Sequence, residues 1–225
     1  MVALIPARNE GPRVGAVVRA ALAHVERVVV VVNGCEDDTA ARAQDAGAEV
    51  ISSDPGYARA LARGYAHLRG QALVQLDADG QHPASAIPAL AAALHHADLV
   101  IGSRLLGDPG YAIPPLRRLG MTALSAWLKA LTGLTVQDTT SGLMALSPKA
   151  VSFFATSFPA QVADTNVLAR AWRAGLVIAE LPVPMRARDG GVELHRGLGG
   201  LTHGLRVLRL TWAEARGTPP TVKFY

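Results

Sequence analysis

The chain has 225 residues, half of which are hydrophobic, and a net charge of +4 at neutral pH. This length is enough for one large domain with a proper core and too short for two domains of ordinary size. Through residue 103 there are 8 basic and 11 acidic residues, and from residue 104 onward 14 and 7, so the halves carry −3 and +7. The basic second half favours an anionic partner. Because no basic cluster is interleaved with aromatic residues, we expect no nucleic acid.

Apolar runs of strand length alternate with segments of helical periodicity through the first hundred residues. The expected strands are residues 2–5, 27–32, 48–51, 72–76 and 98–101. The expected helices are residues 12–23, 37–46, 56–68 and 83–95. Continuous apolar strands joined by crossover helices predict an α/β fold with a mostly parallel sheet covered on both faces. Ligands bind such a sheet outside the carboxyl ends of its strands, where we expect the polar loops 6–10, 33–38 and 77–81 to converge.

The pattern changes after Ser103, where a Gly- and Pro-rich loop begins. The elements expected beyond it are a helix at 115–131, a strand at 143–146, a helix at 164–174 and an amphipathic helix at 200–212. Residues 177–188 are expected to form a strand that prolines interrupt, which suits the edge of a sheet. We expect one domain over residues 1–216 and a C-terminal tail over 217–225.

The stretch LVQLDADGQHP (73–83) ends a predicted buried strand with two carboxylates, Asp77 and Asp79. Side chains at positions i and i+2 of an extended chain point the same way, so both carboxylates would open into the crevice at the strand end. Their mutual repulsion favours a divalent cation with hard oxygen ligands, which usually also holds substrate phosphates. The alternative is a solvated turn in which Asp79 and Gly80 only cap the next helix. Local chemistry alone leaves both interpretations open.

Six motifs stand in order along the chain. They are IPARNE (5–10), VNGCEDDT (32–39), the Gly56 loop, DADGQH (77–82), GSR (102–104) and DTTSG (138–142). Over roughly residues 3–190 this ordered set resembles the family-2 glycosyltransferases with the GT-A fold, in particular the polyprenyl-phosphate (dolichol-phosphate) mannosyl- and glucosyltransferases. The resemblance implies a Rossmann-like three-layer fold in which residues 1–103 bind a nucleotide-diphospho-sugar and residues 104–216 bind the acceptor.

The resemblance assigns the first half to the sugar donor. The implied nucleotide-sugar-binding residues are Pro6, Arg8, Glu10, Asn33, Asp37, Gly56, Asp77, Ala78 and Asp79. The implied ligands of a Mg²⁺ or Mn²⁺ ion are Asp77, Asp79 and Gln81, whereas His82 is expected to form a hydrogen bond. Val32 and Cys35 replace an acid and a hydroxyl of the family pattern, which leaves the identity of any general base open. Asp37 and Asp38 also fit the ordinary chemistry of a helix start.

The resemblance assigns the second half to the acceptor and to the reaction. The implied acceptor-binding residues are Arg104, Arg117, Arg118, Ser141 and Arg188. The implied catalytic residues are Asp138, Asp164, Arg104 and Arg188. Guanidinium groups suit phosphate, although each arginine alone also fits a surface charge, and Asp164 also fits a helix N-cap. A phosphate acceptor needs no strong base because it is already ionised, whereas a hydroxyl acceptor needs a carboxylate to take its proton.

The prediction is a metal-dependent, inverting transfer of a hexose from a donor of the GDP-mannose or UDP-glucose type, with polyprenyl phosphate as the first-choice acceptor. Three alternatives stay open. They are a glycosyltransferase acting on a soluble hydroxyl acceptor, a sugar-phosphate nucleotidyltransferase, and a non-catalytic nucleotide-sugar-binding module.

The sequence also predicts a cytoplasmic protein. The single cysteine, Cys35, excludes an internal disulfide and favours a reducing compartment. There is no signal-peptide pattern and no uninterrupted apolar run of the roughly 18 residues that a membrane-spanning helix needs. The basic, amphipathic segments 119–134 and 200–212 would suit peripheral contact with the inner face of a membrane. They would equally suit packing inside the domain or in a homo-oligomer.

Overall fold

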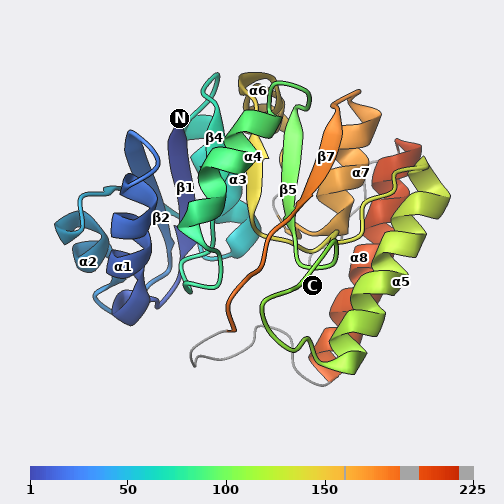
Figure 1. Ribbon diagram of the computed structural model, residues 1–225, viewed down its shortest axis with the longest axis horizontal. Coiled ribbons are helices and arrows are strands. Elements are labelled where there is room, and N and C mark those ends of the chain that lie inside the picture. The colour runs from blue at the N-terminus through green and yellow to red at the C-terminus, as the bar shows by residue number, and fades with distance from the viewer. Residues whose placement is uncertain (160, 188–197, 218–225) are drawn as a thin grey trace.

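The computed structural model describes residues 1–159, 161–187 and 198–217. In this part of the chain, seven strands form one sheet in the order β3-β2-β1-β4-β6-β5-β7 (Figure 1). The strands are β1 (Val2–Ala7), β2 (Arg27–Asn33), β3 (Glu49–Ser53), β4 (Leu73–Gln75), β5 (Leu99–Ser103), β6 (Met144–Leu146) and β7 (Ile178–Pro182). Strand β6 runs antiparallel to both of its neighbours, and every other pairing is parallel. The sheet is therefore mostly parallel, as the continuous apolar runs predicted.

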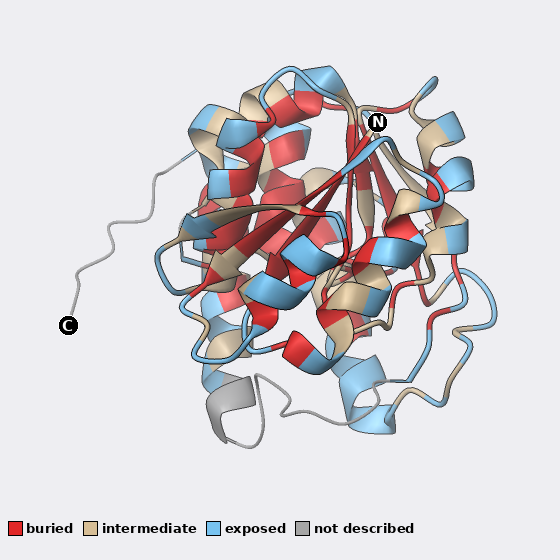
Figure 2. Cartoon of the chain, turned by 90° about the vertical axis from the view of Figure 1, so that its left-hand side faces the viewer, coloured by how far each residue is buried: buried red, intermediate tan, exposed pale blue. Residues whose placement is uncertain are grey.

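Helices cover both faces of the sheet. They are α1 (Gly11–Leu22), α2 (Thr39–Asp45), α3 (Tyr57–His67), α4 (Ile87–Ala93), α5 (Pro115–Thr132), α6 (Pro148–Ser157), α7 (Thr165–Arg173) and α8 (Leu198–Arg216). Successive residues of β1 face opposite sides, so Leu4 packs with α3, α6 and α7, whereas Ala3 and Ile5 pack with α1, α2 and α4. Figure 2 shows the buried strands enclosed by helices whose outer surfaces are exposed. The predicted three-layer α/β class is confirmed.

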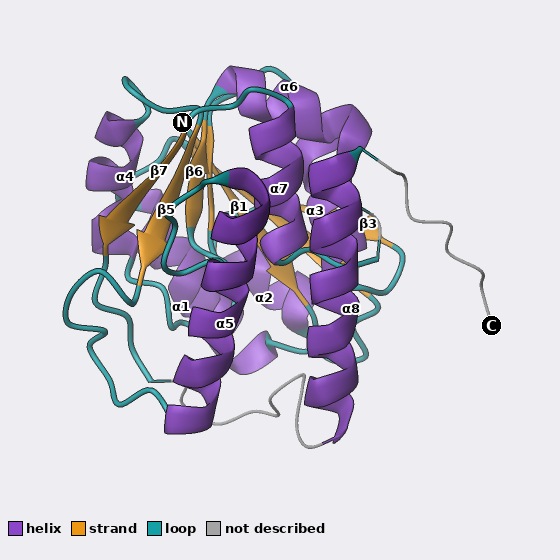
Figure 3. Ribbon diagram, turned by 90° about the vertical axis from the view of Figure 1, so that its right-hand side faces the viewer, coloured by secondary structure: helices purple, strands orange, loops and turns teal. Residues whose placement is uncertain are grey.

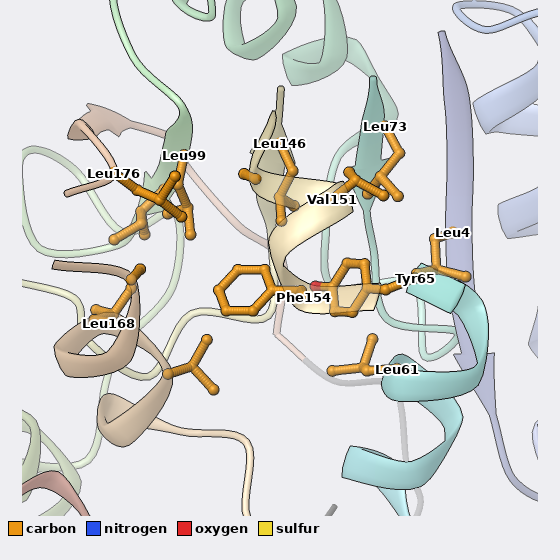
Figure 4. Packing of buried hydrophobic residues seen from close by; sticks show 14 of the residues in the cluster. Leu4, Leu61, Tyr65, Leu73, Leu99, Leu146, Val151, Phe154, Leu168 and Leu176 are labelled. Atoms are coloured by element: carbon orange, nitrogen blue, oxygen red, sulfur yellow. The ribbon is translucent and has the colours of Figure 1, made fainter. Parts of the chain in front are cut away.

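Aromatic side chains fill the core between α3, α6 and the sheet. The ring centroid of Tyr65 lies 5.5 Å from that of Phe154 and 4.9 Å from that of Phe158. Figure 4 shows Tyr65 and Phe154 side by side within the aliphatic core. Such pairs add about 0.5–1.5 kcal/mol beyond the area that they bury. Because α3 begins at Tyr57, this packing also fixes the residue with which α3 starts at the carboxyl edge of the sheet.

The elements predicted in the first half exist, with most boundaries shifted by one or two residues. The segment 83–95 is divided into a 3₁₀ turn (Ala84–Ala86) and α4. Helix α2 begins at Thr39 rather than at residue 37, because the Asp37 carboxylate folds back and accepts a hydrogen bond from the Thr39 amide. The pattern thus located the elements but not the turns that begin them.

The strand predicted over 177–188 is wrong beyond Pro182. Strand β7 lies at the sheet edge, as its prolines indicated, and within the described part of the chain it pairs with β5 alone. The backbone then leaves the sheet, and the Met185 amide donates a hydrogen bond to the Pro109 carbonyl at 2.8 Å. Residue 188 lies outside the described residues. The segment after β7 therefore joins the loop after β5 and does not lengthen the strand.

Helices α5 and α8 lie side by side (Figure 3), and the Trp127 indole Nε1 donates a hydrogen bond to the Leu208 carbonyl at 3.1 Å. Figure 3 also shows both helices extending past the carboxyl ends of β5 and β7. The two segments predicted to be amphipathic helices are therefore helical. None of the helices that the structure describes combines the length and the apolar character needed to cross a membrane.

Candidate active site

Asn33, at the carboxyl end of β2, connects three loops. Its side chain is buried, with Nδ2 donating to the Ala7 carbonyl at 3.0 Å and Oδ1 accepting from the Gly56 amide at 3.2 Å. The Glu36 amide also donates to Oδ1 of Asn9 at 2.9 Å. Gly56 has a φ of +133°, a backbone conformation that favours glycine. The loops after β1, β2 and β3 therefore meet at one edge of the sheet, and the first two of them are among the three loops that were predicted to converge there.

The Asp37 carboxylate fixes the start of α1 against the start of α2. Its Oδ2 accepts from the Gly11 amide at 3.0 Å, and its Oδ1 accepts from the amide and the hydroxyl of Thr39 at 3.1 and 2.5 Å. Burial opposes the charge on Asp37, but these hydrogen bonds outweigh it and lower the pKa of the carboxyl. The Thr39 hydroxyl also accepts from the Glu10 amide at 2.9 Å. Asp37 thus shapes the loops, and a direct contact with a nucleotide stays a prediction.

Asp77 follows β4 and is constrained on three sides. The Tyr57 hydroxyl donates to its Oδ1 at 2.9 Å. His82 accepts a hydrogen bond from the Asp77 amide through Nδ1 at 2.9 Å, and its Nε2 lies 3.7 Å from Oδ2. On the third side, a Cβ added to Gly142 would lie 2.5 Å from Oδ2. His82 therefore forms the hydrogen bond that we expected of it, and Asp77 has little freedom to turn.

Asp79 and Gln81 belong to the same turn, in which Gly80 has a φ of +80°. Oδ1 of Asp79 accepts from the Gln81 amide at 3.1 Å, and Nε2 of Gln81 donates to the Arg186 carbonyl at 3.0 Å. Among the described residues there is no group of three or more His, Cys, Asp or Glu side chains that could hold a metal ion. Two carboxylates with an amide oxygen are the hard donors that Mg²⁺ and Mn²⁺ prefer when substrate phosphates complete the coordination. The turn therefore suits a cation shared with a bound diphosphate.

Arg104 and Asp138 form a buried ion pair. The side chains are 8% and 0% exposed. Asp138 Oδ2 accepts from the backbone amide and from Nε of Arg104 at 3.0 and 2.7 Å, and Oδ1 accepts from Nη2 at 2.7 Å. Burial alone would disfavour the charge on Arg104, but Asp138 raises the pKa of the guanidinium above its usual value. Asp138 is thus engaged in holding Arg104 and does not open onto a substrate crevice.

A cavity of about 220 Å³ lies beside this pair. Its lining residues are Arg104, Leu105, Gly107, Pro109, Tyr111, Ala112, Ile113 and Arg118. The Tyr111 hydroxyl is buried and has no hydrogen-bond partner in the part of the chain that the structure describes. Asp138 balances the charge of Arg104, so Arg118 adds a second guanidinium to this cavity, and guanidinium groups suit an anion such as a phosphate.

Two short segments connect this basic cavity to the turn of Asp77. The Pro109 carbonyl, at the cavity, accepts from the Met185 amide, and the Arg186 amide next to it donates to the Gln81 carbonyl at 3.0 Å. The DTTSG loop runs from Asp138 to Gly142, which lies against Asp77. The basic cavity and the acidic turn are therefore parts of one hydrogen-bonded unit.

The other predicted site residues fall in different settings. The Ser141 hydroxyl is buried and donates to the Gly102 carbonyl at 2.6 Å, so it is used inside the loop. Asp164 caps α7 by accepting from the Thr165 amide, and its Oδ2 lies 3.3 Å from Nε2 of His203. Arg188 lies outside the described residues. Pro6, Ala78 and Glu10 are buried, and Glu10 forms an ion pair with Arg13. Arg8 and Arg117 are exposed.

Sequence reasoning missed three residues that the structure brings to this edge. Tyr57 contacts Asp77, Tyr111 lines the basic cavity, and His203 pairs with Asp164. Tyr57 directly follows Gly56, one of the motifs named above, so its position in the sequence could have indicated that it belongs to the site. His203 lies 39 residues after Asp164, and only the packing of α8 on α7 joins them.

Comparison with known proteins identifies the family of the chain. Residues 2–145 match the family model described as glycosyl transferase family 2. The chain is 28% identical over 214 residues to a dolichyl-phosphate hexose transferase of Haloferax volcanii, which is 92% of this chain and 91% of that protein. It is 32% identical over 140 residues to an undecaprenyl-phosphate mannosyltransferase of Micrococcus luteus, which is 60% of this chain and 56% of that protein.

A solved structure shares the fold. Glucosyl-3-phosphoglycerate synthase of Mycobacterium tuberculosis, in complex with Mn²⁺ and UDP-glucose, matches with a TM-score of 0.75 and 25% identity over 98% of this chain and 80% of that one. The predicted GT-A fold and the resemblance that carried it are confirmed. The chain therefore belongs to glycosyl transferase family 2.

Proposed function

We propose that this hexosyltransferase moves a hexose from a nucleotide-diphospho-sugar to the phosphate of a polyprenyl phosphate, with inversion at the anomeric carbon. The donor would bind to residues 1–103 and the acceptor to residues 104–216 of a single domain, followed by the tail 217–225. The names of the archaeal and bacterial relatives support a lipid phosphate as acceptor. Family membership gives no support to the nucleotidyltransferase alternative.

The donor would lie on the loops that Asn33 and Asp37 hold together at the carboxyl edge. A Mg²⁺ or Mn²⁺ ion would be held by Asp77, Asp79 and Gln81 together with the diphosphate of the donor. When bound, this cation would act as a Lewis acid on the diphosphate leaving group. The Mn²⁺ and UDP-glucose in the structural neighbour support this assignment.

The observation that carries the proposal is the basic cavity next to the acidic turn. Arg104 and Arg118 line it, and the backbone of residues 185–186 connects it to Gln81. A phosphate held there would present an ionised oxygen to the anomeric carbon. As that oxygen forms its bond to carbon, the bond to the nucleoside diphosphate breaks and its electron pair leaves with the diphosphate. No proton has to be removed, so the reaction needs no general base.

The experiment that tests the proposal is a screen of donors against acceptors. The protein is incubated with labelled GDP-mannose or UDP-glucose, Mn²⁺ or Mg²⁺, and either polyprenyl phosphate, phosphoglyceric acid or no acceptor. We expect label in the lipid fraction with one of the two donors. Label in the soluble product alone would refute the lipid acceptor. The absence of both turnover and donor binding would refute the enzymatic assignment, and donor binding without turnover would favour the non-catalytic alternative.

Arg118 gives the screen a matched pair of variants. Arg118→Gln removes a cation from the cavity and should raise the KM for the lipid phosphate about tenfold or more, with donor binding unchanged. Arg69→Gln removes an exposed cation just before β4, at the opposite edge of the sheet, and should leave both values unchanged. Equal effects of the two variants would show that the cavity does not hold the acceptor.

A second candidate, transfer to a hydroxyl, rests on the pairing of Asp164 with His203. Their side chains are 19% and 26% exposed, and Oδ2 and Nε2 are 3.3 Å apart. This is the geometry of a carboxylate–imidazole pair that could accept the proton of a hydroxyl. Asp164→Asn should reduce transfer to a hydroxyl by about 100-fold or more and transfer to a phosphate far less. A larger loss of transfer to the hydroxyl than to the phosphate would show that Asp164 serves as the base for a hydroxyl acceptor.

The exposed leucines of α5 and α8 support the lipid acceptor further. Leu116, Leu119 and Leu205 are 80%, 66% and 62% exposed, although they are large and apolar. The two helices extend past the carboxyl ends of β5 and β7 (Figure 3), and Arg118 of α5 also lines the basic cavity. A cytoplasmic protein could there dock on the inner face of a membrane, where each basic residue adds about 1 kcal/mol at an anionic surface.

Co-sedimentation with vesicles tests this docking. Wild-type protein should pellet with anionic phosphatidylglycerol vesicles at low salt, less at high salt, and little with neutral vesicles. Replacing Leu116 and Leu119 by serine should reduce the pelleted fraction, whereas Val177→Ser, an exposed apolar residue that precedes β7, should not. No pelleting at low salt would refute membrane contact, and a dimer that the leucine variant dissociates would favour the homo-oligomer instead.

A further inference from the structure

A chain of hydrogen-bonded side chains leads from the core of the protein to Asp77. The Tyr65 hydroxyl donates to Oε1 of Gln75 at 2.5 Å. Nε2 of Gln75 donates to the Gly142 carbonyl at 2.9 Å and to the Tyr57 hydroxyl oxygen at 3.3 Å. The Tyr57 hydroxyl then donates to Oδ1 of Asp77 at 2.9 Å. Neither tyrosine was among the site residues that the sequence indicated.

In this series of hydrogen bonds, each donor points toward the Asp77 carboxylate. An ionised Asp77 only accepts hydrogen bonds, so the Tyr57 hydroxyl must donate to it. The Tyr57 oxygen is then free to accept from the amide of Gln75, whose own oxygen accepts from Tyr65. Hydrogen bonds aligned in this way polarise one another, so each strengthens the next inside a low-dielectric interior.

The inner end of the chain is anchored firmly. Tyr65 is 1% exposed and packs between Phe154 and Phe158. Gln75 is 2% exposed and lies in β4 between β1 and β6. Tyr57 is the first residue of α3, the helix that also carries Tyr65. The position of the Tyr57 hydroxyl is therefore set by the core and not by solvent.

We propose that Tyr57 is a positioning residue for the metal-binding carboxylate. Its hydroxyl, fixed through Gln75 and Tyr65, holds Oδ1 of Asp77. The carboxylate would thereby be oriented for a cation that Asp77, Asp79 and Gln81 hold. Gly142 and His82 limit movement on the Oδ2 side, so the carboxylate has one preferred orientation before any ligand binds. Partners that orient a metal ligand typically change metal affinity by about 10- to 100-fold when they are removed. This inference rests on the proposed cation role of Asp77.

Titration with Mn²⁺, followed by the electron paramagnetic resonance signal of the free ion, tests the inference with UDP and with GDP present. Tyr57→Phe should weaken Mn²⁺ binding about tenfold or more. Its melting temperature should stay close to that of the wild type, because the ring still packs at the start of α3. Tyr65→Phe removes only the far end of the chain and should weaken binding less, in the same direction. Arg69→Gln changes an exposed residue just before β4, at the opposite edge of the sheet, and should leave Mn²⁺ affinity unchanged.

The outcomes separate this inference from the proposed function. Wild-type protein that binds no Mn²⁺ with either nucleotide would refute the cation site and, with it, this role of Tyr57. Wild-type binding that persists unchanged in Tyr57→Phe would refute the role of Tyr57 alone. If Tyr57→Phe does not fold, Tyr65→Phe decides, and unchanged Mn²⁺ affinity in that variant would overturn the proposal.

Discussion

Asp138→Asn should destabilise the fold strongly, because it leaves a buried guanidinium without its counter-charge. Asp138 is fully buried, and three donors of Arg104 converge on its two oxygens. Asparagine keeps the shape but replaces one acceptor oxygen by an amide that would face a donor. Breaking a buried pair in this way costs about 3–5 kcal/mol. For a chain of this length, each kcal/mol lowers the melting temperature by about 2–4 °C, so we expect a fall of about 6–20 °C.

Thermal and urea denaturation, followed by circular dichroism, measure this loss. The matched control is Asp164→Asn, which makes the same chemical change at a carboxylate that is 19% exposed and should lower the melting temperature far less. A variant Asp138→Asn that melts with the wild type but no longer transfers sugar would refute the structural reasoning. It would show that Asp138 acts on the substrate, as the family resemblance implied.

Three further outcomes are expected. Gly142→Ala would place a Cβ 2.5 Å from Oδ2 of Asp77 and should weaken Mn²⁺-dependent nucleotide binding about tenfold or more, measured by calorimetry. Asp79→Ala should abolish turnover without changing the melting temperature, and full activity in metal-replete buffer would contradict the cation site. Because the pKa of Asp37 is lower in the folded protein than its usual 3.8, its contribution to stability is complete above that value and is lost as the pH falls through the folded pKa. The melting-temperature difference between wild type and Asp37→Asn should therefore shrink at low pH, and a constant difference would exclude this origin.

The sequence was a good guide to the layers of the fold because they depend on repeating patterns. Five apolar runs and the segments between them gave the strands and helices of the first half and indicated that the strands run parallel, whereas their order in the sheet was not predicted. The second half was harder to predict. Helix α6 went unnoticed, although the Ser147 hydroxyl caps it by accepting from the Ala150 amide and Pro148 opens it, which are ordinary signals of a helix start. The strand after residue 177 was drawn too long because apolar residues continue past Pro182.

The site was predictable where a motif holds its residues close together, and not where tertiary packing assembles it. Asp77, Asp79 and Gln81 lie in one turn, so their spacing was informative. Tyr65 and Gln75 looked like ordinary core and strand residues, because a side chain's hydrogen-bond partner cannot be read from periodicity. The motif predicted Asp138 and Ser141 beside the sugar or the acceptor, and that contact stays a prediction. Only the structure shows that their polar atoms form hydrogen bonds within the protein.

One loop joins the two halves of the proposed reaction. Residues 138–142 hold Arg104 at one end through Asp138 and confine Asp77 at the other through Gly142. Arg104 lines the cavity assigned to the acceptor phosphate, and Asp77 belongs to the turn assigned to the cation and the donor. Both groups are charged, and both are fixed from inside the protein before any substrate arrives. The fold sets the orientation of these groups, so the charges that bring an anionic acceptor close to an anionic donor are already in place in the free protein. Little rearrangement is then needed in the catalytic step.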